Sequence, residues 1–269
     1  MDVFGTDALI GDYRLSDHGL MLVTFNFEDT RGLGTGMTTS EQFLGRNARP
    51  VYLGSAFNSK LSLTATIMQN WNVTGKTYFT TQEIREILGR LTGFQGYKKM
   101  YVYSPGDEED LYYNVRVDDD VEYEMSGDKV VGIRIPLSCD SQFAWTEVEL
   151  DRVTSESDEM FSILNTSDDR YGYLFPVIRI TSDSAIPSLT ITNLTDNERA
   201  TMIENVSAGD VITIDSRLNK ITSVMHANFS ETFNYKFPRL VYGTNEIQVS
   251  NPITLHFSMT IPRKVGMIP

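Results

Sequence analysis

Histidine and cysteine are the side chains most often used as metal ligands and nucleophiles, and this sequence of 269 residues has only four of them. They are His18, His226, His256 and Cys139, and no two of them lie within four residues of each other. Zinc sites usually draw on such close pairs, so the spacing gives no indication of a metal site. We expect Cys139 to be buried and inert, and His256 to lie on the outward face of a strand.

The other motifs that could carry chemistry lack the context that they need. A Ser–His–Asp set is usually supported by a Gly-x-Ser-x-Gly turn, which does not occur in this sequence. The glycine-rich residues 32–36 are followed by neither a Lys-Ser/Thr pair nor a predicted helix, so they do not match a phosphate-binding loop. A pair of glycosidase carboxylates stays open because acids are abundant. We expect a protein that is not an enzyme and that uses no cofactor.

Two runs of consecutive acids lie in the first half of the chain, at residues 107–110 and 118–120. Calcium-binding loops alternate their ligands with spacers and a glycine, so runs of adjacent acids match them poorly. A solvated turn or surface is the simpler interpretation. The acids of interest are Asp118, Asp119, Asp120, Glu108 and Glu109.

Aromatic side chains are plentiful, with 14 Phe, 13 Tyr and 2 Trp. Tyr171, Tyr173 and Tyr235 could line a groove that binds sugar rings by stacking. However, no tryptophan follows Trp145. Packing in a core or at an interface therefore explains these tyrosines better.

The formal net charge of −13 argues against binding to the nucleic-acid backbone or to an anionic membrane. A single cysteine favours a reducing compartment such as a cytoplasm. The first residues show neither a basic segment nor a long apolar core, so we expect no signal peptide and no membrane insertion.

The elements that would position these residues are mainly strands. Residues 20–27 form an apolar run, and residues 60–68 alternate between apolar and polar side chains, as half-buried strands do. Residues 99–103 with 111–117, and 121–125 with 129–135, are separated by turn residues and predict two hairpins.

One helix is predicted over residues 80–91. Thr80 and Glu83 form a capping box, and Ile84, Ile87 and Leu91 follow on one apolar face. Gly93 lies just past the end of this helix, where a left-handed cap is expected. Covering a sheet is the favoured role for this helix.

The long polar connection between residues 30 and 58 predicts an extended arm or hairpin that contacts a neighbour. Residues 146–166 are acidic and rich in Ser and Thr, and we place a linker there. The predicted domains are residues 1–145, a β-sandwich-like domain with one helix and the arm, and residues 146–269. In the second domain, short and evenly spaced strands predict an antiparallel β-sandwich.

Several short motifs occur in an order that is similar to one known family. They are Leu44-Gly45-Arg46, residues 111–117 and 133–145 in the first domain, and residues 175–180, 209–215 and 240–247 in the second. Together they resemble the distal tail protein (Dit) family of long-tailed bacteriophages, over nearly the whole chain.

This resemblance implies a mainly β, two-domain subunit of a six-membered ring in the phage tail. It implies a C-terminal sandwich like those of galectins and carbohydrate-binding modules. It also implies a tail tube protein and a tail-associated tip protein as partners, synthesis in the cytoplasm of the bacterial host, and DNA passing through the ring without specific binding. Asp118, Asp119, Asp120, Glu108 and Glu109 would then be candidates for the channel lining. The alternative is a carbohydrate-binding adhesin that recognises glycans on the host surface.

Overall fold

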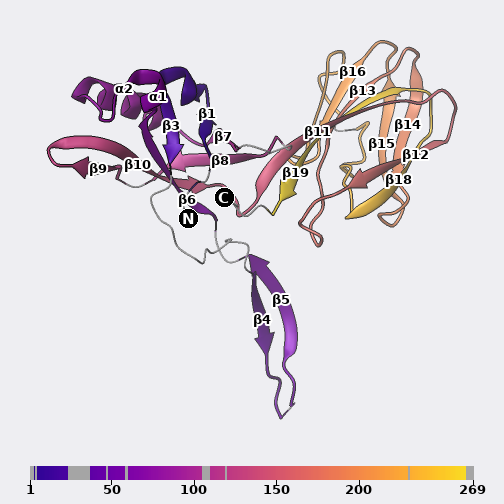
Figure 1. Cartoon of the computed structure of the whole chain (residues 1–269). Helices are drawn as coiled ribbons and strands as arrows, with labels where there is room; N and C mark the ends of the chain where they lie inside the picture. Colours follow the sequence, from indigo (N-terminus) through magenta and orange to yellow (C-terminus); the bar gives the residue numbers. More distant parts are fainter. Residues whose placement is uncertain are drawn as a thin grey trace. The chain divides into compact units, whose positions relative to one another are not determined.

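The computed structural model describes residues 3, 5–23, 37–46, 48–57, 60–104, 110–118, 120–229 and 231–264. The chain divides into two compact units (Figure 1). The first comprises Met1–Trp145 with Lys264–Pro269, and the second comprises Thr146–Arg263. Among the described residues, no helix is both long and apolar enough to span a bilayer.

The first unit is built mainly from antiparallel strands. The strands are β1 (Asp7–Ile10), β2 (Tyr13–Arg14), β3 (Leu20–Val23), β4 (Met37–Gln42), β5 (Val51–Phe57), β6 (Ser62–Gln69), β7 (Lys98–Tyr103), β8 (Tyr112–Val117), β9 (Glu122–Ser126) and β10 (Lys129–Cys139). The helices are the 3-10 helix η1 (Ser16–His18), α1 (Trp71–Thr74) and α2 (Thr81–Leu91). The predicted hairpins β7–β8 and β9–β10 are confirmed.

The main sheet of this unit runs in the order β1–β7–β8–β10–β6–β3, with β2 beside β1 and β9 beside the first half of β10. The amide of Leu22 on β3 donates to the carbonyl of Thr6, 3.2 Å away, just before β1. This bond brings the two ends of the strand order together, so the sheet curls around its core.

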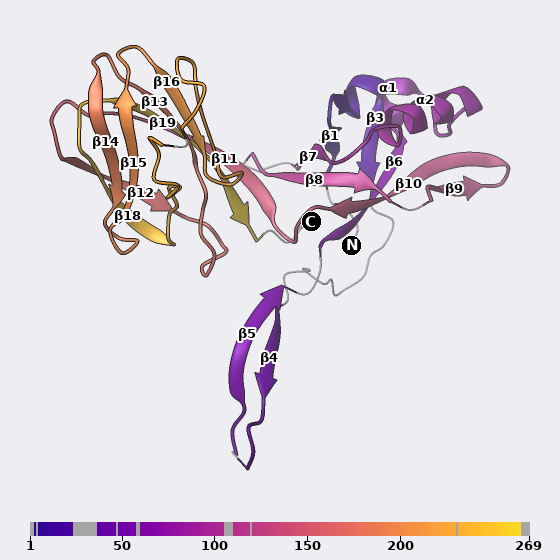
Figure 2. The same cartoon turned by 180° about the vertical axis from the view of Figure 1, so that it is seen from behind.

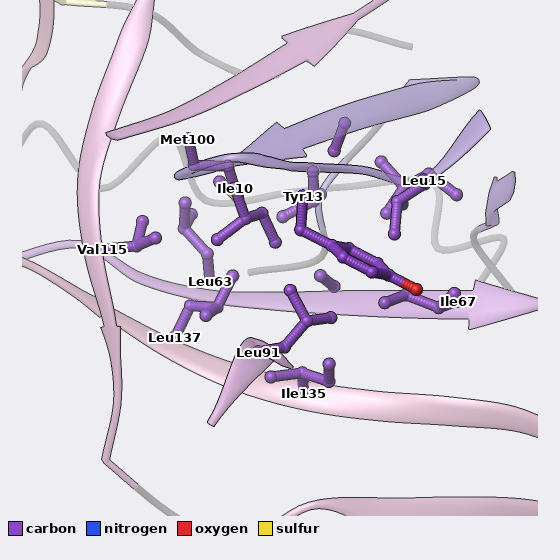
Figure 3. Close-up of a cluster of buried hydrophobic side chains, with 14 of the residues drawn as sticks. Ile10, Tyr13, Leu15, Leu63, Ile67, Leu91, Met100, Val115, Ile135 and Leu137 are labelled. Atoms are coloured by element: carbon purple, nitrogen blue, oxygen red, sulfur yellow. The ribbon is translucent and has the colours of Figure 1, made fainter. Parts of the chain in front are cut away.

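The core of the first unit follows from the alternation of side chains along β6 and β10. Leu63 on β6 lies directly opposite Leu137 on β10, and both are buried. Figure 3 shows these two residues with Met100 of β7 and Leu91 of α2 around the same space. Because successive strand residues point to opposite faces, Ser62 and Thr64 of β6 face away from this core, whereas Thr66 further along the strand is buried.

Helix α2 begins as predicted, with a complete capping box. The Thr80 amide donates to Glu83 Oε2 at 2.8 Å, and the Glu83 amide donates to Thr80 Oγ1 at 3.3 Å. Ile87 and Leu91 are buried against the sheet.

The prediction for Gly93 was wrong. Thr92 caps the helix with an ordinary φ of −110°, and Gly93 is not among the residues with positive φ. A Cβ at Gly93 would lie only 2.7 Å from the Gly89 carbonyl oxygen, so close packing is what calls for glycine there. The first unit also contains two short helices that were not predicted, α1 and η1.

The long polar connection contains the hairpin that we predicted. Strands β4 and β5 form a separate two-stranded sheet, with a bulge between Ser40 and Glu41. Every residue of β4 is exposed. We call residues 37–57 the arm.

The second unit is an antiparallel β-sandwich, as predicted. Its strands are β11 (Ala144–Val153), β12 (Glu159–Asn165), β13 (Val177–Thr181), β14 (Ile186–Asn193), β15 (Arg199–Val206), β16 (Val211–Asp215), β17 (Lys220–Ser223), β18 (Gly243–Val249) and β19 (Thr254–Arg263). One sheet has the order β17–β16–β13–β19–β11 and the other β12–β18–β14–β15. Phe161 of β12 meets Phe257 of β19 edge to face at 6.1 Å, so the two sheets share one core (Figure 2).

Residues 146–166 do not form the expected linker. They supply most of β11 and all of β12. Along β11, Val148 and Leu150 pack against the core of the second unit, while Glu149 and Asp151 are exposed. Among the acids that suggested a linker, Asp151 lies on the outward face of β11, because alternation places every second residue in solvent, whereas Glu156 and Asp158 lie in the turn before β12.

Candidate functional site

One serine, one histidine and one aspartate of the second unit come together without forming a catalytic arrangement. Ser207 Oγ lies 3.0 Å from His226 Nε2, and Asp210 Oδ2 lies 3.9 Å from the same nitrogen. A general-base histidine needs its two ring nitrogens on opposite partners. Asp210 instead accepts hydrogen bonds from Ser223 Oγ at 2.7 and 2.8 Å, which stabilises the chain beyond β17.

Cys139 and His256 lie where the sequence predicted them. Cys139 is fully buried, and this burial raises the pKa of its thiol to about 12, with a further contribution from Asp140. The thiolate is the nucleophilic form, so Cys139 is inert at neutral pH. His256 is partly exposed on β19, and its Nδ1 lies 2.7 Å from Asp151 Oδ1.

The candidate acids do not form a bare acidic patch. Asp118 Oδ1 lies 2.6 Å from Arg116 Nε. A hydrogen bond from Ser138, followed by the one from Arg116, lowers the pKa of Asp118. Its charge is therefore offset locally. Asp120 is exposed, whereas Asp119, Glu108 and Glu109 lie outside the described residues.

The candidate tyrosines have different surroundings. Tyr171 is 92% exposed, while the Tyr173 ring is covered by the Arg239 guanidinium at 3.8 Å. Tyr235 has a φ of 56°, and its ring lies 5.5 Å from that of Phe233. Two of the three rings thus already have side-chain partners, and Tyr171 alone is fully open for stacking.

The loop that carries Tyr171 is held by bonds that the sequence analysis missed. Ser167 Oγ accepts from the Asp169 amide at 3.0 Å, and Asp169 Oδ1 accepts from the Gly172 amide at 3.1 Å. A Cβ at Gly172 would collide with the Asp169 carboxylate. Ser, Asp and Gly within six residues are a turn signal that could have been recognised.

A buried ion pair was also missed. Arg239 Nε and Nη2 contact the two carboxylate oxygens of Asp196 at 2.7 and 3.1 Å, and the Asp196 side chain is only 2% exposed. This bidentate pair raises the pKa of Arg239 and holds its guanidinium over Tyr173. The two residues are 43 positions apart, so no local pattern reveals them.

The most unusual surface of the first unit is the arm. Its exposed apolar side chains include Phe43 at 64%, Leu44 at 51%, Tyr52 at 61% and Leu53 at 58%. An isolated two-stranded hairpin is marginally stable in water, and clustered apolar exposure indicates a surface that binds a partner. The signal was present in the sequence as two apolar runs within a polar connection.

A β-rich two-unit fold and an arm with uncovered apolar side chains are typical of a structural, partner-binding class of protein. Residues 4–141 match a family model described as a phage tail protein N-terminal domain, and residues 143–259 match a phage tail C-terminal domain. The chain therefore belongs to this family of phage tail proteins.

Solved structures with the same fold are phage hub and baseplate proteins. SPP1 Dit, described as a paradigm of the hub adsorption apparatus in phages infecting Gram-positive bacteria, matches with a TM-score of 0.68 and 10% identity over 96% of this chain and 100% of that one. A chain of the phage P2 baseplate, in its activated conformation with Ca, matches with a TM-score of 0.52 and 11% identity, over 95% and 94%. No curated protein matches the sequence. The resemblance to the Dit family is thus confirmed for the fold.

Proposed function

We propose that this phage tail protein is the ring-forming subunit of a tail-tip hub that joins the tail tube to the tip or baseplate. The observation that carries the proposal is the match over the full length of SPP1 Dit, by a chain whose two halves both match phage tail families. A chain that kept only one domain of such a hub would not match it from end to end.

The proposed assembly is a ring of six copies, with a tail tube protein on one side and a tip protein on the other. DNA passes through its channel. The protein is made in the cytoplasm of the host and resides in the virion tail. The role is structural and not enzymatic. Two observations support this proposal: Cys139 is inert, and Ser207 and Asp210 both lie beside the same ring nitrogen of His226.

The arm supports assembly into a ring. Its two strands pair with each other, and its apolar side chains are exposed on the isolated chain. Burial of apolar surface stabilises association by about 25 cal/mol per Å² before the costs of ordering, so covering the arm in an assembly is favourable. We propose that it contacts a neighbouring subunit.

The test compares the parent chain with a variant in which residues 37–57 are replaced by a short Gly-Ser linker. We expect light scattering to give six times the chain mass for the parent and the monomer mass for the variant. Negative-stain images should show rings only for the parent. Hydrogen exchange of β6 and β10 is the control for folding, and we expect it to be unchanged. A variant of unchanged mass would contradict the role of the arm, whereas a monomeric parent would contradict the ring.

A further inference from the structure

The β9–β10 hairpin is a second uncovered surface of the first unit. Figure 2 shows β9 and the start of β10 extending beyond the neighbouring strands. In the described part of the chain, β9 pairs only with β10, so its other edge is free. Tyr123 is 46% exposed and Met125 is 54% exposed on this strand. Free edges with exposed apolar side chains tend to pair with another chain unless something covers them.

This hairpin carries an excess of acid. Glu122, Glu124 and Asp128 lie on it, against only the cations Lys129 and Arg134. Glu122 and Glu124 share the Arg134 guanidinium, at 3.4 and 3.7 Å. Asp128 has no ion-pair partner among the described residues. A partner that fits this surface should therefore be apolar and basic.

The tip of the arm, residues 43–50, has that chemistry. Phe43 and Leu44 are exposed, and Arg46 and Arg49 are exposed close to them. Neither arginine has an ion-pair partner among the residues that the structure describes. The tip carries no acid, so its charge and its apolar character are both complementary to the β9–β10 hairpin.

A competing acceptor is the apolar surface of α1, where Trp71 is 51% exposed and Val73 is 70% exposed. Lys76 and Glu83 beside it neutralise each other at 2.7 Å, and Glu86, which lines the same pocket as Lys76, shares the surface of α2 with Arg85 and Arg90. That surface offers the arm no excess of acid. The basic tip of the arm is attracted to the acidic β9–β10 hairpin more strongly than to the neutral surface of α1. Such a charge difference can decide between two apolar surfaces that are otherwise similar.

We propose that the tip of the arm of one subunit docks on the β9–β10 hairpin of a second copy of this chain. Phe43 and Leu44 cover Tyr123 and Met125, and the tip arginines face the acids of the hairpin. This inference rests on the proposed ring, and it identifies the surface that receives the arm.

Cysteine cross-linking tests the contact directly. We expect Leu44→Cys with Met125→Cys to give, on mild oxidation of the assembled ring, a ladder of covalent multimers on a denaturing gel. The buried Cys139 does not react in the folded chain, and Leu44→Cys alone is the control. The matched variant Leu44→Cys with Val73→Cys should stay monomeric on the gel. If the ring forms but Leu44→Cys with Met125→Cys gives no ladder, the proposed docking is wrong. The same holds if only Leu44→Cys with Val73→Cys gives a ladder. In both cases the proposal of a ring still stands. A monomeric parent would overturn both.

Charge reversal provides a second test that needs no oxidation. Arg46→Glu with Arg49→Glu should raise the dissociation constant of the ring about tenfold or more, with a weaker effect at high salt. Adding Glu122→Arg and Asp128→Arg to that variant should restore most of the affinity. These four side chains are exposed, so folding should be unaffected. Loss without rescue would show that the arginines of the tip face a different surface.

Discussion

Two buried asparagines connect three segments of the second unit. Asn245 Oδ1 accepts from the Val241 amide and from Asn193 Nδ2, each at 2.9 Å, while Asn245 Nδ2 donates to the Val241 and Gly243 carbonyls. Asn193 Nδ2 also donates to the Arg239 carbonyl. Polar groups that are buried must find such partners, so these amides stabilise the turn before β18.

Replacement of Asn245 by alanine should destabilise the second unit by about 2–3 kcal/mol, because several buried backbone groups lose their partner. Hydrogen exchange measured by mass spectrometry on peptides from β14 and β18 would show this as faster opening. Thr244→Ala is the matched control, since Thr244 is an exposed neighbour. Equal protection in the two variants would show that the amide network adds little stability.

Among the described carboxylates of the first unit, Glu83 is the one whose pKa is lowered as far as about 2. Its hydrogen bond from Lys76, and then the one from the Thr80 amide, lower its pKa from 4.5 to about 2. A carboxylate with a lowered folded pKa stabilises the fold above the unfolded pKa and loses that contribution as the pH falls through the folded pKa. The start of α2 should thus weaken between pH 4.5 and 2.

An NMR titration of the Glu83 carboxyl carbon should give a midpoint near pH 2 in the parent chain. In Lys76→Met the midpoint should move up toward 4.5, because the largest cause of the shift is removed. Lys129→Met is a suitable control, since Lys129 lies over Tyr78 and is not among the groups that shift the pKa of Glu83. A parent midpoint near 4.5 would show that the Lys76 bond is not formed in solution.

The loop before β13 presents the aromatic ring of Tyr171 to solvent. Leu174 of this segment exchanges two backbone hydrogen bonds with Leu240, at 2.8 and 2.9 Å, which anchors the loop beside a second segment. Tyr171 is thus displayed from a fixed backbone. Ordered, exposed tyrosine is typical of protein interfaces as well as of sugar sites.

We predict that the chain binds no glycan at micromolar affinity, because Arg239 covers the Tyr173 ring and Phe233 lies against the Tyr235 ring, so Tyr171 is the only candidate ring without an aromatic or cationic partner among the described residues. A glycan array on the full chain is the measurement, with Tyr171→Ala as the paired variant. Micromolar binding by the parent that disappears in Tyr171→Ala would favour the adhesin alternative.

For the proposed ring, the charge that lines the channel is the property that matters for passing DNA. Duplex DNA carries about one charge per 1.7 Å of its axis, and basic linings bind it by releasing counterions. The chain has a formal charge of −13, but repulsion reaches only about 8–10 Å at physiological salt. Acids therefore act on DNA only if they face the channel. We keep Asp118, Asp119 and Asp120 as proposals for that lining, although Asp118 is partly neutralised by Arg116.

Changing Asp118, Asp119 and Asp120 to lysine should leave the ring assembled and make it retain DNA at low salt. Retention should fall steeply as salt rises, which a filter-binding series would show. The control changes three exposed acids of the second unit, Glu149, Asp151 and Glu156, to lysine, which gives the same total charge. If both variants behave alike, the acids at 118–120 lie outside the channel.

Local patterns in the sequence predicted the elements well. The capping box of α2, the hairpins β7–β8 and β9–β10, the arm and the outward His256 all depend on side chains within a few positions of each other. Spacing along the chain is enough for such features, because helices and strands repeat with fixed periods.

Features that depend on distant pairing needed the tertiary structure. The ion pair of Arg239 with Asp196, the bond of Asp118 with Ser138 and the amide network of Asn245 join segments that are far apart in the chain. Residues 146–166 resemble a linker in composition, yet they form strands because their apolar side chains find a core on the second unit. Composition records which side chains are polar, whereas the packing of remote segments decides which of them are exposed, paired or buried.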